Sequence, residues 1–178
     1  MKKKELYFNA ILFAVLIIVS NYTVQFPINE WLTYGAIIYP FTFLITDILS
    51  EKYSKKEVLR VVQIGSVLAI VPTIMIADIR IAIASIFTFF VIQQFDIVIF
   101  YKIKVRYPNL WWLRNNGSTM ISQFFDTALF FMLAFSFIMP FDMIIKLIIG
   151  DYIIKLIMAL LDTPIFYYLA IRVKKLRG

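Results

Sequence analysis

Long apolar stretches separated by short polar segments run through the whole chain. The first of them, from Leu6 to Asn29, contains no charged residue. At about 1.5 Å per residue it is long enough to cross a hydrocarbon core of about 30 Å. Five similar stretches follow, so the pattern predicts an all-α integral membrane protein. The six transmembrane helices are expected at about 6–26, 31–50, 58–77, 81–101, 116–139 and 146–171.

The polar segments between these stretches are short, and only 102–115 approaches 14 residues. We therefore expect a single transmembrane domain over 1–178, without a soluble domain. The first stretch follows three lysines, as a signal peptide would, but it is long and lacks a small-x-small cleavage site. Because further spans follow, we interpret it as a retained helix.

The basic residues orient the predicted helices. With both termini in the cytoplasm, 15 of the 18 Lys and Arg lie on the cytoplasmic side, as the positive-inside rule requires. They are Lys2, Lys3, Lys4, Lys52, Lys55, Lys56, Arg60, Lys102, Lys104, Arg106, Arg114, Arg172, Lys174, Lys175 and Arg177. The net charge of +7 is thus a topology signal, and no nucleic-acid partner is expected. Trp31, Trp111 and Trp112 fit interfacial anchors.

Composition narrows the function. The chain is 62% hydrophobic and 16% charged, with a mean hydropathy of +0.85, whereas a soluble domain is about half apolar and a quarter charged. Cys and His are absent, which excludes disulfides, thiol nucleophiles, thiolate zinc sites and imidazole chemistry. No nucleotide-phosphate motif is present. We therefore expect no enzyme, no cofactor, no metal and no ATPase within the chain.

One polar stripe runs along the fifth predicted span. Its members are Asn115, Thr119, Ser122, Gln123 and Asp126, whose spacing puts them within about a quarter of the helix circumference. Such residues can serve as interhelical glue or as a ligand site. Hydrogen bonding between helices does not by itself need an aspartate, so the stripe favours a ligand site.

Other polar residues lie at membrane depth. Ser85, Gln93 and Asp96 share one side of the fourth span, and Asp151, Lys155 and Asp162 share one side of the sixth. The i, i+4 spacing of Asp151 and Lys155 predicts a buried ion pair. Asp162 precedes Thr163-Pro164 and has no sequence-local partner, so it is a site candidate that could carry a proton.

The second span contains Pro40, flanked by Tyr39 and Phe41. This proline indicates either a simple kink or a broken segment that lines a cavity. Further along, Asp47 and Glu51 are expected to pair with Lys55 and Lys56 at the interface. Pro72 predicts a kink in the third span.

Three blocks of the chain resemble the queuosine precursor transporter family, also known as the vitamin uptake transporter (VUT) group. The first block is Pro40-Phe-Thr-Phe-Leu-Ile-Thr-Asp47 with Ser50-Glu51 and Tyr53, the second is Arg80–Ser85 with Gln93 and Asp96, and the third is Trp112–Asp126 with Thr127. Ser54 and Ile92 depart from the family pattern, at positions where we expect Gly and Ser.

This resemblance implies a six-helix inner-membrane bundle similar to the substrate-binding components of vitamin uptake systems. It implies import of 7-cyano-7-deazaguanine or 7-aminomethyl-7-deazaguanine for tRNA modification salvage. A carboxylate accepts the adjacent N1–H and 2-amino donors of such a base, and amides read its other edges. The candidate substrate-binding residues are Asp126, Gln123, Asp162, Asn115, Asn116, Asp96, Gln93, Thr119, Ser122, Lys155 and Phe41.

Two alternatives remain beside this interpretation. The chain could be a substrate-binding membrane subunit that requires an external ATPase module, or it could take up another small planar vitamin-like compound. A homodimer or an energising subunit would then be its protein partner, beside the lipid bilayer. Arg114 could reach the substrate, but its position favours lipid phosphate.

Overall fold

The computed structural model describes residues 1–29 and 32–172, and nearly all of these residues are helical. The elements are α1 (Lys3–Thr23), β1 (Pro27–Asn29), β2 (Leu32–Thr33), α2 (Gly35–Ile38), α3 (Pro40–Lys52), α4 (Lys55–Ile76), α5 (Ile79–Arg106), α6 (Trp111–Phe135), α7 (Phe141–Phe166) and the π-helical turn η1 (Tyr167–Arg172).

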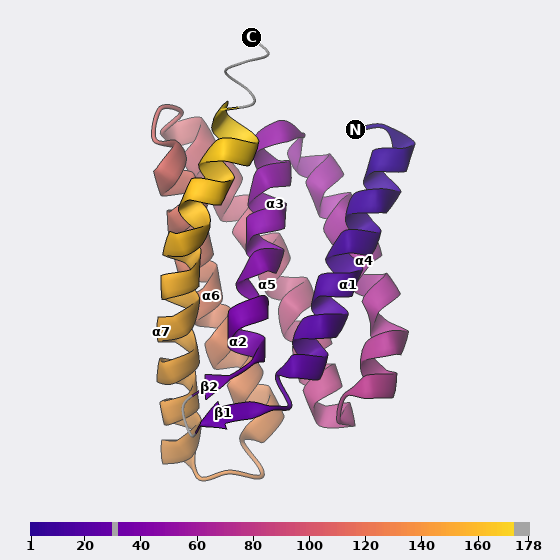
Figure 1. Ribbon diagram of the computed structural model, residues 1–178, viewed down its shortest axis with the longest axis vertical. Helices are drawn as coiled ribbons and strands as arrows, with labels where there is room; N and C mark the ends of the chain where they lie inside the picture. Colours follow the sequence, from indigo (N-terminus) through magenta and orange to yellow (C-terminus); the bar gives the residue numbers. More distant parts are fainter. Residues whose placement is uncertain (30–31, 173–178) are drawn as a thin grey trace.

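The long helices lie roughly parallel to one axis and form a bundle (Figure 1). α1 begins and η1 ends at the same end of this bundle, which we call the terminal end. The β1–β2 hairpin lies at the opposite end, the hairpin end, together with the connections between α4 and α5 and between α6 and α7. The closest packing joins α5 to α6, α1 to α4 and α6 to α7.

Four helices are individually long and apolar enough to cross a membrane: α1, α4, α5 and α6. These helices correspond to the first, third, fourth and fifth predicted spans, so the prediction of an all-α multi-pass membrane protein is confirmed. α7 is 26 residues long but carries Asp151, Lys155 and Asp162 in its interior. The second predicted span is divided into α2 and α3. Trp31, Lys174, Lys175 and Arg177 lie outside the described residues.

Local sequence explains several helix ends. Pro40 is the first residue of α3, where its missing N–H is tolerated, and Tyr39 forms the junction with α2. Ser54 and Glu57 form a capping box at the start of α4. Asp78 caps α5 by accepting a hydrogen bond from the backbone N–H of Arg80. Pro40 thus breaks the helix, while α4 continues through Pro72.

The hairpin was not predicted by the hydrophobic pattern. β1 and β2 are antiparallel, with Pro27 opposite Thr33 and Asn29 opposite Leu32. Because strands this short leave no alternating apolar signature, the span prediction assigned part of the hairpin to the second transmembrane helix.

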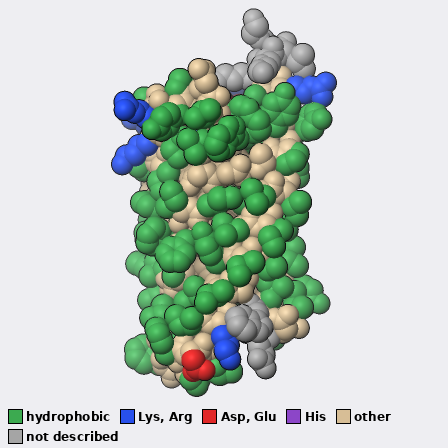
Figure 2. All heavy atoms as spheres, turned by 90° about the vertical axis from the view of Figure 1, so that its left-hand side faces the viewer, with side chains coloured by type: hydrophobic (Ala, Val, Ile, Leu, Met, Phe, Trp, Pro, Cys, Tyr) green, Lys and Arg blue, Asp and Glu red, His purple; other side chains and the backbone are tan. Residues whose placement is uncertain are grey.

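The outside of the bundle is apolar, and its interior holds charged and amide side chains beside apolar clusters. Figure 2 shows one face covered by hydrophobic side chains, with Lys and Arg gathered toward its ends. By contrast, Asp47, Gln93, Asp96, Gln123 and Asp126 are all at most 2% exposed. This inversion relative to a soluble protein is expected when the solvent is lipid, because charged groups then face the bundle interior.

Candidate functional site

A small, partly open cavity lies between α1, α2, α5, α6 and α7. Its lining residues are Ser20, Asn21, Val24, Gly35, Ala36, Tyr39, Ser85, Thr88, Asp126, Phe130, Phe131, Asp151 and Lys155. Its volume, counted as space for the centre of a water molecule, is about 30 Å³, so it has room for only one or two waters. The cavity therefore combines buried charges and hydroxyls with an aromatic wall.

Asp126 is the central acceptor of this cavity. Its Oδ1 accepts a 2.6 Å hydrogen bond from the phenol of Tyr39, which lies at the junction of α2 and α3. Its Oδ2 lies 3.3 Å from Nζ of Lys155. The residue just before Pro40 thus places its phenol against a carboxylate of α6.

Lys155 joins two carboxylates at the cavity wall. Its Nζ lies 2.9 Å from Oδ2 of Asp151, which confirms the predicted i, i+4 ion pair. It also donates a 2.9 Å hydrogen bond to Oγ1 of Thr127 and lies 4.6 Å from the ring centroid of Tyr39. We call Tyr39, Asp126, Asp151 and Lys155 the cavity cluster. With two carboxylates and one ammonium, this cluster has a formal net charge of −1.

A second polar patch of the cavity comes from α1 and α5. Ser85 donates a hydrogen bond to Oδ1 of Asn21, and Nδ2 of Asn21 donates to Oγ1 of Thr73 at 3.3 Å. The helical spacing predicts the polar face of Ser85, whereas Tyr39 and Asn21 are site residues that the sequence pattern does not single out. The available signal for Asn21 was an amide, next to Ser20, inside an otherwise apolar span.

The predicted polar stripe of α6 faces the bundle interior. Asn115, Thr119, Ser122, Gln123 and Asp126 are all between 0% and 5% exposed. Only Asp126 among them lines the cavity. Neither amide atom of Gln123 has a hydrogen-bond partner among the described residues.

The face of α5 that carries Gln93 and Asp96 meets α3. Nε2 of Gln93 donates to Oγ1 of Thr42 at 3.1 Å, and Oγ1 of Thr46 donates to Oε1 of Gln93 at 3.2 Å. Asp47, the residue after Thr46, accepts a 3.0 Å hydrogen bond from Oγ1 of Thr119. These contacts fasten α3 to both α5 and α6.

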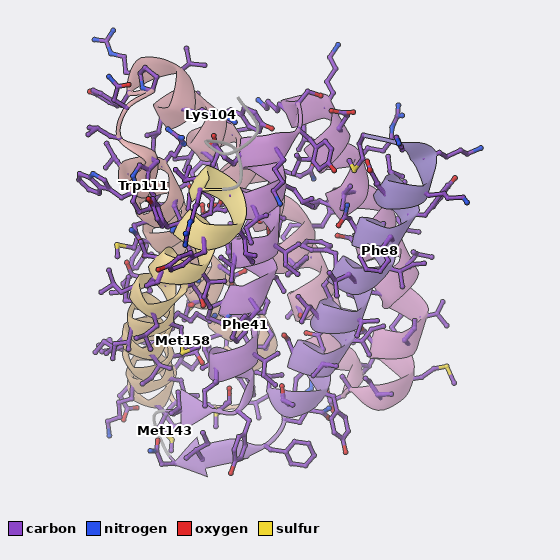
Figure 3. The ribbon with its side chains drawn as sticks, turned by 45° about the horizontal axis from the view of Figure 1, so that its top comes forward. Phe8, Phe41, Lys104, Trp111, Met143 and Met158 are labelled. Carbon is purple, nitrogen blue, oxygen red and sulfur yellow. The ribbon has the colours of Figure 1, made fainter. Side chains whose placement is uncertain are left out.

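The expected pairing of Asp47 and Glu51 with Lys55 and Lys56 is not what the structure shows. Glu51 is buried, and its Oε2 lies 2.9 Å from Nε of Arg114 and 3.5 Å from Nζ of Lys104. The prediction that Arg114 meets lipid phosphate is wrong, because Arg114 is only 5% exposed and also donates to the carbonyl of Pro108. Lys104 lies toward the terminal end, as does Trp111 (Figure 3).

The remaining predicted site residues lie away from the cavity lining. Asp162 is 5% exposed, and the neighbouring Thr163 donates a 2.9 Å hydrogen bond to Oδ1 of Asn116. Phe41 packs against the apolar cluster of Leu44, Phe100 and Phe166. These residues connect α3, α6 and α7 nearer the terminal end.

A wider recess of about 740 Å³ opens at the hairpin end. The hairpin residues Pro27–Asn29 and Thr33 line it, together with Met143 at the start of α7 (Figure 3). The recess shares Val24 and Phe131 with the cavity, so these two side chains separate the two spaces. At its rim, the backbone N–H of Arg80 lowers the pKa of Asp78 below its ordinary value by hydrogen bonding to the carboxylate.

This arrangement suits a compact ligand that carries N–H donors. Carboxylates accept two parallel N–H bonds at once, and buried amides supply both donors and acceptors. Among the residues that the structure describes, no group of three or more acidic side chains is arranged to hold a metal ion.

Comparison with known proteins adds independent information. The family described as "Putative vitamin uptake transporter" matches residues 33–79 and 72–169. The chain is 30% identical over 160 residues to the "Probable queuosine precursor transporter" of Bacillus subtilis, covering 76% of this chain and 70% of that protein. It is 26% identical over 155 residues to the "Queuosine precursor transporter" of Escherichia coli, covering 74% and 69%. No solved structure matches significantly.

Proposed function

The chain belongs to this family of vitamin uptake transporters, and on that premise we propose that it imports a queuosine precursor across the cytoplasmic (inner) membrane. The substrates are 7-cyano-7-deazaguanine or 7-aminomethyl-7-deazaguanine, taken up for tRNA modification salvage. The names of the Bacillus subtilis and Escherichia coli relatives support this substrate class. The family is one of transporters and not of enzymes.

The single observation that carries the proposal is the cavity cluster. A 7-deazaguanine presents its N1–H and 2-amino group side by side, and Asp126 is the buried carboxylate that can accept both. In the structure its two oxygens are occupied by Tyr39 and Lys155. The substrate therefore replaces at least one of these donors when it binds, so that binding exchanges internal contacts for ligand contacts.

The polar stripe of α6 completes the proposed site. Gln123 lies three residues before Asp126 and has unused donors and acceptors, which suit the carbonyl and ring edges of the base. We expect the substrate to leave the cavity toward the terminal end and to contact further polar residues on this route. They are Asn115, Asn116, Thr119, Ser122, Gln93 and Asp162.

The cavity in its described form is too small for a bicyclic base, since ligand sites typically occupy about 300–1,000 Å³. The proposed transport cycle therefore includes an opening toward the hairpin-end recess and a second opening toward the terminal end. Val24 and Phe131 would separate first, because they stand between the recess and the cavity.

Six spans with both termini in the cytoplasm are part of this proposal. The broken α2–α3 segment and α7 would complete the four clearly apolar helices. Most basic residues lie at the terminal end, whereas Arg80 and Lys146 line the recess at the hairpin end. The positive-inside rule then puts the recess outside the cell and makes the direction of transport inward.

The test is uptake of labelled 7-cyano-7-deazaguanine into proteoliposomes that contain only this protein. Asp126→Asn should abolish uptake, because an amide cannot accept both donors of the base. Asp142→Asn is the matched control, since Asp142 is exposed in the first turn of α7. Saturable binding in detergent without uptake would favour a subunit that needs an external ATPase. The absence of both binding and uptake would contradict the proposed substrate class.

A further inference from the structure

Two buried carboxylates lie close together outside the cavity cluster. Asp47 on α3 is 1% exposed and Asp96 on α5 is 0% exposed. Thr46, the residue before Asp47, is hydrogen-bonded to Gln93, which lies one turn before Asp96, so the two carboxylates lie at the same α3–α5 contact. Neither lines the cavity or the recess. Neither takes part in an ion pair with a residue that the structure describes.

The pair is also poor in hydrogen-bond donors of normal geometry. Thr119 donates to Oδ2 of Asp47, but Oδ1 of Asp47 and both oxygens of Asp96 have no donor in the described part of the chain. Ser122 supplies a second observation. Its hydroxyl is fully buried beside Asp96 and has no hydrogen-bond partner among residues 1–29 and 32–172. Ser118, the other hydroxyl nearby, donates to the carbonyl of Arg114.

Three carboxylate oxygens and one hydroxyl therefore converge without a positive charge among them. Burying an unpaired carboxylate in an apolar medium is costly enough that the group takes up a proton instead. Two carboxylates that share a site repel each other in addition, so both are not charged at once. A proton on one of them would satisfy the other through a hydrogen bond and would remove the repulsion.

We propose that Asp47 and Asp96 form the proton-coupling site of the transporter, which carries one proton inward with each substrate molecule. The inference rests on the proposed function, because it names the energy source for that transport. No bond other than O–H is made or broken. The proton binds a carboxylate oxygen of the pair from the outer side and leaves it to the cytoplasm.

The position of the pair along the helices suits this role. On α5, Asp96 follows Thr88, which lines the cavity, and precedes Lys104 near the terminal end. On α3, Asp47 lies between the Tyr39 junction and Glu51. The pair thus stands between the cavity and the terminal end. A conformational opening that releases substrate toward the terminal end would also expose Asp47 and Asp96 to water.

Other charged side chains on the packed helices are also buried or half-buried. They are Glu51 on α3, Lys104 on α5, Arg114 and Asp126 on α6, and Asp151, Lys155 and Asp162 on α7. Glu51 contacts Lys104 and Arg114, and Asp126 and Asp151 contact Lys155. The charged residues of α1 and α4 lie in the first two turns of those helices. Asp47 and Asp96 are therefore the two adjacent carboxylates that share no basic partner within the described ranges.

The transport test separates coupling from substrate binding. Proteoliposomes with the full chain are given an inward proton gradient, and accumulation of labelled 7-cyano-7-deazaguanine is compared with exchange at equal pH. Asp47→Asn and Asp96→Asn should both lose gradient-driven accumulation. Asp47→Asn should keep exchange, and Asp47→Glu should recover part of the accumulation. Asp142→Asn should behave as the unmodified protein.

Two results would overturn the coupling site. One is that Asp96→Asn still accumulates substrate with the proton gradient. The other is that the unmodified protein is driven by a sodium gradient at clamped pH and not by protons. If the unmodified protein shows no exchange at all, the proposed function has failed.

A second measurement does not depend on the substrate. Infrared spectra of the purified protein should contain the C=O band of a protonated carboxylic acid, and this band should be lost in Asp96→Asn or Asp47→Asn. Asp142→Asn should leave the band in place. A spectrum in which neither Asp47→Asn nor Asp96→Asn changes this band would overturn the inference whatever the transport assay shows. Thermal unfolding of each variant verifies that it is folded.

Discussion

The phenol of Tyr39 donates a 2.6 Å hydrogen bond to Oδ1 of Asp126, a residue 87 positions later in the chain. Tyr39 is the residue between α2 and α3, and its backbone keeps helical dihedral angles. The residue before Pro40 therefore supplies a hydrogen-bond donor inside the bundle. The same contact brings the Tyr39 ring to within 4.6 Å of Nζ of Lys155.

Tyr39→Phe should destabilise the protein. The substitution removes a donor from a buried carboxylate while it keeps the ring, and a hydrogen bond to a charged group is worth about 1.5–3 kcal/mol. We expect a lower thermal midpoint in detergent. Tyr34→Phe is the control, because Tyr34 is 52% exposed. Equal midpoints for the two variants would show that the Tyr39 bond contributes nothing to stability.

Lys155→Met should be more damaging still. It leaves Asp126 and Asp151 buried without their shared cation, and breaking a buried ion pair costs about 3–5 kcal/mol. Adding Asp151→Asn to Lys155→Met should recover part of the loss, since it removes one of the two orphaned charges. Lys146→Met, at an exposed position on the same helix, should have little effect. A double variant no more stable than Lys155→Met would argue against this electrostatic account.

Periodicity was enough to find the long helices and the inward face of α6. The 3.6-residue spacing fixes which residues share a face, so the burial of Asn115, Thr119 and Asp126 could be predicted. It carries no information on which other helix that face meets. The contacts of Tyr39 with Asp126 and of Glu51 with Arg114 join residues 87 and 63 positions apart, and these required the structure.

Residue spacing also could not predict that the candidate site residues have different hydrogen-bond partners. Asp96, Gln123 and Asp126 lie on two predicted spans but in one set of candidate substrate-binding residues. In the structure, Asp126 has both a phenol and an ammonium as donors, whereas Asp96 has no hydrogen-bond donor among the described residues. Equivalent residue types on adjacent helices thus have different surroundings, because those surroundings come from α2, α3 and α7.

Gly65→Ala should weaken the packing of α1 on α4. A Cβ at Gly65 would lie 2.8 Å from the carbonyl oxygen of Ala10 and 2.8 Å from Cδ1 of Phe13, so backbone atoms would have to shift. Overpacking of this kind costs about 1–3 kcal/mol. The control is Gly117→Ala, where the nearest atom is at an ordinary 3.5 Å. Gly117→Ala should be neutral or slightly stabilising, because alanine favours the helix. Similar thermal midpoints for the two variants would contradict the close approach of α1 and α4.

The orientation of the bundle can be tested without removing any native thiol, because the chain contains no cysteine. Lys146→Cys introduces a thiol at the hairpin end, and Lys56→Cys introduces one at the terminal end. Both lysines are exposed, so the two thiols should be equally reactive in detergent. In intact cells, a membrane-impermeant maleimide should label only the Lys146→Cys variant, because the positive-inside rule places the terminal end in the cytoplasm. In inverted vesicles, the Lys56→Cys variant should be labelled instead.

The opposite pattern would place the recess in the cytoplasm and would reverse the proposed direction of transport. Labelling of both variants in intact cells would show that the two ends are not separated by the membrane, which would contradict the six-span arrangement itself.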